Sequence, residues 1–392
     1  MSDTLMHTYN RLPVTFSYGE GVWLVDTEGV RYLDALSGIA VCGLGHSHPA
    51  ITQAISQQAG KLLHTSNLYN IASQQKLGDV LTGMAGMDRV FFSNSGAEAN
   101  EAAIKLARLY GNNLKIENPT IIVMNNSFHG RTLATLSATG SRRAHAGFEP
   151  LVHGFIRVPY NDLKAIESLS NNRSIVAILV EPIQGEGGIN IPSKNYLNGM
   201  RSLCDKNNWL MMIDEVQAGM GRTGKFFAFQ HSEIKPDVLT LAKALANGVP
   251  IGACLAHGKA ANLFVPGHHG TTFGGNPLAC NAALATCETL KLDNVINNAE
   301  RIGSEIINGF RQNLSAIEGV IDIRGKGMMI GIELKMQCAD LVRLALEKNL
   351  LINVTAGNVV RLLPPLIMTT KEANFLVETL SNLIKEFLLG KK

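Results

Sequence analysis

Short apolar runs separated by amphipathic stretches recur along most of the chain, and two of them lead directly into an aspartate and a lysine. Residues 210–213 run directly into Asp214, and residues 238–242 run directly into Lys243. A short apolar run bounded by turn residues predicts a buried strand, here of a parallel sheet. Open α/β sheets bind their ligands at the carboxyl ends of their strands, so Asp214 and Lys243 are expected at the ligand-binding edge.

From residue 50 onward, apolar runs alternate with helical patterns, with no repeat and no low-complexity linker. This alternation is typical of an α/β sheet whose strands are joined by crossover helices. A long amphipathic helix is expected from residue 282 to about residue 314. The other strands of the sheet are expected at residues 90–92, 121–124, 175–180 and 251–256.

The two ends of the chain carry a different pattern. Residues 21–38 and residues 319–334 each predict a β-hairpin, and short strands and helices follow the second hairpin. We therefore predict an α/β fold with a large domain at 51–285, which holds a mainly parallel sheet flanked by helices. Residues 1–50 and 286–392 are expected to form a smaller α+β domain.

Composition narrows the class of protein. The 392 residues are 46% hydrophobic and 17% charged, a mixture typical of a globular enzyme, and the net charge of +3 favours neither nucleic acid nor a membrane surface. No apolar stretch approaches the roughly 20 residues that span a bilayer. The six cysteines are scattered and the N-terminus lacks a secretory signal, so we expect a cytoplasmic protein with free thiols. His46 and His48 have no third ligand at a useful spacing, so no metal is expected.

Alone, neither Asp214 nor Lys243 requires a functional explanation. A structural ion pair, or a strand end that emerges into solvent, explains a single charge at either position more often than catalysis does. The neighbouring segments change this balance, because they place possible binding groups at the ends of other strands.

The segment at 90–111 predicts a strand, a turn of small residues and a helix. Ser95 is expected to cap the helix, and Gly96 allows a ligand to approach the backbone closely. A helix N-terminus with free N–H groups binds anions such as phosphate, although an ordinary capped helix has the same pattern.

Residues 125–132 follow another predicted strand and contain an aromatic ring and a cation. Phe128 is placed to stack on a planar cofactor, and Arg131 to bind a carboxylate through two hydrogen bonds. A core phenylalanine and a surface arginine fit this segment equally well. Glu181 and Glu186, which follow the strand at 175–180, are either acceptors in a cleft or solvated loop charges.

Two glycine-rich segments are similar to nucleotide-binding loops, but neither matches such a motif. GMGRTGKF at 219–226 has Phe226 where a phosphate-binding loop has the Ser or Thr that binds magnesium. RGKGMMIG at 324–331 leads into an apolar strand rather than a helix. Both segments are expected to be turns.

An anion site, a stacking ring, a buried aspartate and a lysine are thus expected at the carboxyl ends of strands in one sheet. This set fits an enzyme that binds pyridoxal phosphate, with Lys243 forming a Schiff base and Asp214 supporting the cofactor.

The same residues resemble the class-III (omega) aminotransferases, which are fold-type-I pyridoxal-phosphate enzymes. The lysine lies 29 residues after the aspartate of DEVQ, which is a specific signature. The resemblance implies the fold-type-I architecture, pyridoxal 5'-phosphate as cofactor and a homodimer with shared active sites. It covers nearly the whole chain and is carried by GHSHP, SNSGAEANEAAIKLAR, SFHGRT, EPIQGEGG, DEVQAGMGRTG, LAKALANGVPIGA and TTFGGNPLA.

Carried over by position, the resemblance assigns Lys243 to the Schiff base and Asp214 to the pyridine nitrogen. Val216 and Phe128 would pack on the two faces of the ring, and Gln217 would reach its hydroxyl. The remaining implied residues are Ser95, Gly96 and Ala97 for the phosphate, Thr272 for the phosphate of the neighbouring subunit, Glu215 for the cofactor, and Arg131, Thr271, Glu186 and Arg361 for the substrates.

The implied reaction moves a terminal amino group to 2-oxoglutarate and releases glutamate. Arg361 would hold the carboxylate of the oxo-acid, and Glu186 would neutralise Arg361 when the amine donor enters. Ornithine aminotransferases carry a tyrosine where this chain has the apolar residues 38–41, and an apolar wall suits an uncharged acylated nitrogen. We therefore expect N2-acetyl-L-ornithine as the donor and N-acetylglutamate 5-semialdehyde as a product, as in arginine biosynthesis. Succinylornithine, ornithine and 4-aminobutyrate are alternative donors, and an inactive binding module is the alternative outside enzymes.

Overall fold

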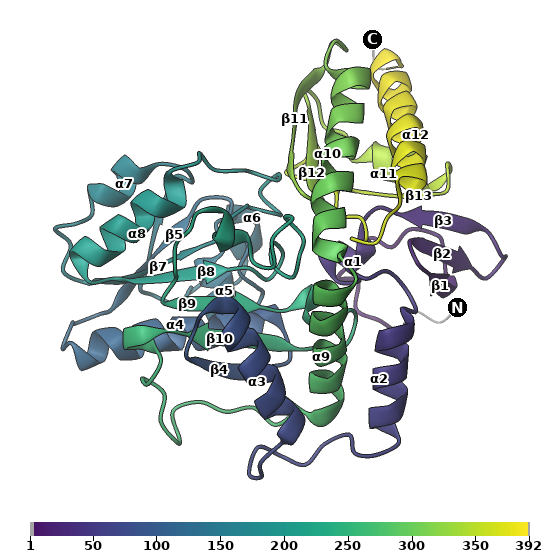
Figure 1. Cartoon of the computed structure of the whole chain (residues 1–392). Helices are drawn as coiled ribbons and strands as arrows, with labels where there is room; N and C mark the ends of the chain where they lie inside the picture. The colour runs from purple at the N-terminus through teal and green to yellow at the C-terminus, as the bar shows by residue number, and fades with distance from the viewer. Residues whose placement is uncertain (1–3, 391–392) are drawn as a thin grey trace.

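The computed structural model describes residues 4–390, which form three β-sheets and their covering helices (Figure 1). The central sheet has seven strands in the order β4-β10-β9-β8-β7-β5-β6. Five of them, β5 to β9, pair in parallel, whereas β10 is antiparallel to both β4 and β9. The expectation of an α/β fold with a mainly parallel sheet is confirmed. The strands are β4 (Arg89–Ser93), β5 (Thr120–Met124), β6 (Phe155–Val158), β7 (Ile175–Val180), β8 (Leu210–Asp214), β9 (Val238–Leu241) and β10 (Gly252–Ala256).

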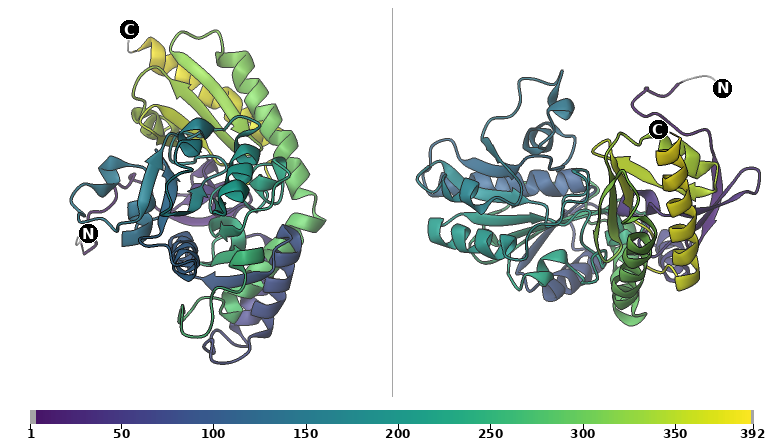
Figure 2. Two further views of the ribbon diagram at one scale, coloured as in Figure 1. Left: turned by 90° about the vertical axis from the view of Figure 1, so that its left-hand side faces the viewer. Right: turned by 90° about the horizontal axis from the view of Figure 1, so that it is seen from above.

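Both faces of the central sheet are buried, as the continuous apolar runs predict. Along β8, Leu210 and Met212 belong to one core cluster, while Met211 and Ile213 belong to the other. Helix α4 (Gly96–Asn113) packs across β7 to β10 on the first face, and α8 (Tyr196–Asn207) packs on the second (Figure 2). The other helices of this part are α3 (Ala72–Ala85), α5 (Leu133–Ala138), α6 (Arg142–His145) and α7 (Leu163–Glu167), with 3₁₀ turns η1 (Ala228–His231), η2 (Lys243–Ala246) and η3 (Gly258–Ala260).

The first sheet is built from the two ends of the chain. Its strands β1 (Phe16–Glu20), β2 (Trp23–Asp26) and β3 (Arg31–Asp34) form antiparallel hairpins, and β13 (Leu350–Leu351) adds to β3 in parallel. The hairpin expected at residues 21–38 is therefore present. Helices α1 (Ser37–Ala40) and α2 (Pro49–Ala59) lead from this sheet to the central one.

The third sheet carries the order β11-β12-β15-β14 and is entirely antiparallel. Helix α10 packs on both β11 and the final helix, α12. The predicted domain division at residues 50 and 285 stays a prediction, and its second boundary falls inside α9. The elements are β11 (Val320–Lys326), β12 (Met329–Leu334), β14 (Asn353–Thr355), β15 (Val359–Leu362), α9 (Pro277–Leu292), α10 (Val295–Leu314), α11 (Asp340–Leu346) and α12 (Thr370–Leu389).

The expectation of one long helix from residue 282 to 314 was wrong. The chain forms α9 and α10, which are separated at Asp293 and Asn294 and follow one another along the molecule (Figure 1). Asn294 adopts a left-handed backbone with φ of 55°, a conformation that asparagine tolerates and that ends a helix. Strand β6, at the edge of the central sheet, was not expected.

Within residues 4–390, none of the helices combines the length and the apolar character needed to cross a bilayer. The same residues contain no group of three or more His, Cys, Asp or Glu side chains placed to bind a metal ion.

Candidate active site

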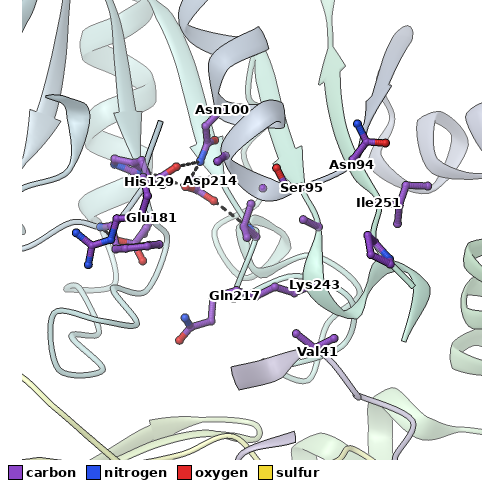
Figure 3. A pocket seen from close by; sticks show the side chains of 18 of the residues that line it. Val41, Asn94, Ser95, Asn100, His129, Glu181, Asp214, Gln217, Lys243 and Ile251 are labelled. Carbon is purple, nitrogen blue, oxygen red and sulfur yellow. Dashed lines mark hydrogen bonds and ion pairs between the residues drawn. The ribbon is translucent and has the colours of Figure 1, made fainter. Parts of the chain in front are cut away.

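A cavity of 440 Å³ lies where several strands of the central sheet end (Figure 3). Residues that follow β4, β5, β7, β8 and β9 all contribute to its wall, as expected for a ligand site in an open α/β sheet. The structure brings together nine of the residues that the sequence singled out. They are Ser95, Gly96, Ala97, Phe128, Arg131, Asp214, Val216, Gln217 and Lys243.

Asp214 is almost fully buried, and its carboxylate is held by three donors. Asn100 Nδ2 donates to Asp214 Oδ2 at 2.7 Å, and His129 Nδ1 lies 2.8 Å from the same oxygen. The backbone N–H of Val216 donates to Oδ1 at 3.0 Å. Figure 3 shows Asn100, His129 and Asp214 joined in this way, with Lys243 below them. These hydrogen bonds fix the direction of the Asp214 carboxylate at the cavity wall.

Asn100 and His129 are functional candidates that the sequence analysis missed. Asn100 also donates to the carbonyl of His129 at 2.8 Å and accepts a hydrogen bond from Thr240 at 2.7 Å. His129 Nε2 is buried and has no hydrogen-bond partner among the described residues. His129 belongs to the SFHGRT segment, and Asn100 lies one turn after Gly96 on α4. Those positions were visible in the sequence, but their convergence on Asp214 was not.

A second carboxyl group, that of Glu181, is buried at the end of β7. It accepts the backbone N–H groups of Phe128 at 2.9 Å and of Gly185 at 3.1 Å. Burial raises the pKa of Glu181 to about 7, with Asp214 raising it further and His129 opposing. The sequence left Glu181 undecided between a cleft acceptor and a loop charge, and the structure places it in the cavity wall.

Lys243 lies two residues after the end of β9 and has a left-handed backbone with φ of 47°. Burial lowers the pKa of its amine, Arg361 lowers it further, and Glu186 and Asp214 act in the opposite direction. A lowered pKa increases the neutral fraction of the amine, which is the form that acts as a nucleophile or a base.

The N-terminus of α4 forms another part of the wall. Ser95 caps this helix by accepting the N–H of Glu98 at 3.2 Å, and Gly96 and Ala97 begin its first turn. A Cβ atom at Gly96 would lie 2.6 Å from Val216 Cγ1, so only glycine fits this close packing. Phe128 also lines the cavity, and the Arg131 guanidinium carbon lies 5.2 Å from the centre of its ring.

These groups fit pyridoxal phosphate. A helix N-terminus suits the phosphate, and Phe128 and Val216 offer surfaces for a planar ring. The buried carboxylate of Asp214 suits a protonated ring nitrogen, and the desolvated amine of Lys243 suits an aldehyde.

Arg361 and Glu186 form an ion pair beside the cavity rather than in its lining. Arg361 Nη1 lies 2.5 Å from Glu186 Oε1 and donates to Gln217 Oε1 at 3.3 Å, which connects the pair to the cavity wall. Burial alone would raise the pKa of Glu186, but the Arg361 guanidinium outweighs it and lowers that pKa.

The other three predicted residues lie away from the cavity lining. Glu215 is buried and accepts the N–H groups of Ala228 and Phe229, each at 2.7 Å, so its carboxyl group supports the turn η1. Thr271 accepts a hydrogen bond from the Asn94 side chain at 3.2 Å, and Thr272 is exposed on the following position.

Comparison with known proteins gives consistent matches along the whole chain. A family model described as aminotransferase class-III matches residues 4–384. The acetylornithine aminotransferase of Nitrosomonas europaea is 60% identical over 98% of this chain and 98% of that protein, and that of Methanocaldococcus jannaschii is 47% identical over 97% and 96%. Among solved structures, an ornithine aminotransferase from Toxoplasma gondii has a TM-score of 0.95 at 33% identity, covering 99% of this chain and 94% of that one. An acetylornithine aminotransferase from Elizabethkingia anophelis has a TM-score of 0.87 at 36% identity, covering 97% and 96%.

Proposed function

The chain belongs to the class-III aminotransferase family, and from this membership we propose that it is an acetylornithine aminotransferase. It uses pyridoxal 5'-phosphate to move the terminal amino group of N2-acetyl-L-ornithine to 2-oxoglutarate. The products are N-acetylglutamate 5-semialdehyde and L-glutamate, and the reaction belongs to arginine biosynthesis. The observation that carries the proposal is that Lys243, Asp214 and the N-terminus of α4 surround one cavity in a chain 60% identical to such an enzyme.

When bound, pyridoxal phosphate supplies an aldehyde that condenses with amines and a ring that withdraws electrons from the carbon bearing the amine. Lys243 would hold the cofactor covalently, and once the substrate amine has displaced it, its free amine would move a proton from the amine-bearing carbon of the substrate to the former aldehyde carbon of the cofactor. Asp214, fixed by Asn100 and His129, would keep a proton on the ring nitrogen. Ser95, Gly96 and Ala97 would bind the phosphate.

Two arginines serve the two substrates in this proposal. Arg131, at the cavity wall, would bind a substrate carboxylate, and Arg361 would bind a carboxylate of 2-oxoglutarate. Glu186 would neutralise Arg361 while the amine donor is bound. Val41 presents an apolar side chain to the cavity, which supports a donor whose second nitrogen is acylated and uncharged.

A homodimer is part of the proposal. Thr272 lies outside its own cavity, on an exposed loop, and would reach the phosphate site of the second copy. Asn67, on the loop between α2 and α3, connects that loop to the one that carries Thr272 by donating to the carbonyls of Thr271 and Gly274, each at 3.1 Å. Large exposed apolar side chains on these loops support burial against a partner. They are Leu62, Leu63, Leu68, Tyr69, Val265 and Phe273.

A cytoplasmic location is also proposed. It is supported by the six cysteines, none of which forms a disulfide in the structure, because a reducing compartment keeps thiols free.

The test is an assay of the purified holoenzyme with 2-oxoglutarate and each of four donors: N-acetylornithine, succinylornithine, ornithine and 4-aminobutyrate. Glutamate formation should have its highest kcat/KM with N-acetylornithine. A preference for ornithine over its acetyl derivative would contradict the proposed substrate.

A lysine variant tests the catalytic assignment. Lys243→Ala should lose the visible absorption of covalently held cofactor and all transamination, whereas Lys164→Ala, which removes an exposed lysine on α7, should keep both. Full activity in Lys243→Ala would contradict the assignment.

A further inference from the structure

Strand β14 lies directly beside the ion pair between Arg361 and Glu186. Asn353 on β14 is the cross-strand partner of Arg361 on β15, so the register of the sheet fixes the two residues side by side. Asn353 Oδ1 accepts a hydrogen bond from Arg361 Nη2 at 2.8 Å. The strand therefore holds one end of the guanidinium independently of Glu186.

The same strand also holds the other member of the pair, but through its backbone. The hydroxyl of Thr355 donates to the main-chain carbonyl of Glu186. The Glu186 side chain is 35% exposed, whereas that of Arg361 is 1% exposed. If this ion pair opens, we therefore expect the carboxylate of Glu186 to move, while the guanidinium of Arg361 and the backbone of residue 186 stay in place.

An amide oxygen is a suitable group for this task. It accepts a hydrogen bond and fixes the direction of the guanidinium, but it leaves the positive charge available to a substrate carboxylate. An aspartate at position 353 would neutralise that charge permanently. Without any acceptor at position 353, Nη2 of Arg361 would lose its hydrogen bond to that residue. The neighbouring Nε of Arg361 is already buried without a hydrogen-bond partner.

We propose that Asn353 is a positioning residue for 2-oxoglutarate: it keeps Arg361 directed toward the oxo-acid when Glu186 moves away. This inference rests on the proposed role of Arg361 in binding that substrate. While Glu186 is paired with Arg361, both residues hold the guanidinium, so Asn353 becomes decisive only after Glu186 has moved away. We therefore expect Asn353 to affect the half-reaction with the oxo-acid and to leave the half-reaction with the amine donor unchanged.

The experiment measures the two half-reactions of the holoenzyme separately, by visible absorption, in Asn353→Ala and Asn353→Asp. A hydrogen bond to a charged group corresponds to roughly a 10- to 100-fold change in an equilibrium constant. Asn353→Ala should raise the half-saturating concentration of 2-oxoglutarate by about this factor, with that of N-acetylornithine changed by less than about twofold. Asn353→Asp preserves the size of the side chain and a hydrogen-bond acceptor, but its charge should weaken the binding of 2-oxoglutarate at least as much as Asn353→Ala does.

The matched control is Asn358→Ala. Asn358 lies in the turn between the same two strands, and its side chain donates to the carbonyl of Leu334 at 2.8 Å without touching Arg361. This variant should leave both half-reactions unchanged. The inference would be overturned if Asn353→Ala raised the half-saturating concentrations of both substrates equally, or if neither Asn353 variant had an effect.

Arg361→Ala separates the two levels of the argument. If Arg361→Ala leaves the oxo-acid half-reaction intact, the proposed role of Arg361 fails and the inference fails with it. If Arg361→Ala impairs that half-reaction and the Asn353 variants do not, only the role of Asn353 is wrong.

Discussion

Gly96→Ala should weaken cofactor binding, because the added methyl group has no room. Its Cβ would lie 2.6 Å from Cγ1 and 2.9 Å from Cγ2 of Val216, whereas ordinary contacts begin at 3.4 Å. Val216 would therefore have to retreat by about 0.8 Å, the difference between 3.4 and 2.6 Å. Val216 is β-branched and stiff, and its N–H donates to Asp214 Oδ1, so its movement disturbs a ring-packing surface and the carboxylate together.

The expected magnitude follows from the cost of overpacking. Forcing a methyl group into a packed site costs about 1–3 kcal/mol, which is roughly a 5- to 150-fold increase in a dissociation constant. The measurement is a titration of the cofactor-free protein with pyridoxal phosphate, followed by absorbance, with thermal unfolding of the cofactor-free form as the check on folding.

Gly83→Ala is the matched control for this prediction. A Cβ at Gly83 in α3 would meet nothing within 4 Å. It should leave cofactor affinity unchanged and stabilise the helix by about 0.5–1 kcal/mol. A folded Gly96→Ala protein whose dissociation constant stays within about twofold of the parent would refute the reasoning.

Three further predictions concern stability and reactivity. Gly303→Ala should lower the free energy of unfolding by about 3 kcal/mol or more in chemical denaturation. The reason is that its Cβ would lie 2.1 Å from the backbone oxygen of Gly327, which cannot move aside. An unfolding curve like that of the parent protein would contradict this prediction. Burial raises the pKa of Glu215 to about 8, so the folded state holds a proton there that the unfolded state releases above about 4.5. The contribution of the Glu215 proton to the free energy of unfolding is present below pH 4.5 and is lost as the pH rises toward 8, at up to about 1.4 kcal/mol per pH unit. Glu215→Gln should make the free energy of unfolding, measured by chemical denaturation, fall less steeply over this pH range. An unchanged slope would count against the prediction. Five cysteines are buried and only Cys42 is partly exposed, so a thiol reagent should modify about one cysteine per native chain, and none rapidly in Cys42→Ser.

The sequence predicted the central strands well because burial on both faces leaves a clear apolar signal. The expected strands at 210–213 and 238–242 correspond to β8 and β9 within one residue at one end. Strand β6 lies at the edge of the sheet, where Arg157 interrupts the apolar pattern, so periodicity did not reveal it. The break between α9 and α10 was missed because helical periodicity continues on both sides of Asn294.

The candidate site was predictable where its residues follow strands, and unpredictable where side chains meet through the fold. Ser95, Phe128, Asp214 and Lys243 come together because strand ends share one edge of the sheet. The pairing of Asn100 with Asp214 joins residues 114 positions apart and depends on how α4 packs over the sheet. Sequence patterns predict the order of strands and helices along the chain, but they do not predict how α4 packs over the sheet.

The left-handed backbone of Lys243 has an evolutionary consequence. With φ of 47°, any residue with a Cβ is strained there by about 1–2 kcal/mol, and the desolvated amine adds a second local cost. Selection for catalysis therefore retains a lysine at this position although another residue would make the fold more stable. A descendant released from that selection would gain stability by acquiring glycine at position 243, and accordingly Lys243→Gly should unfold at a higher temperature than Lys243→Ala.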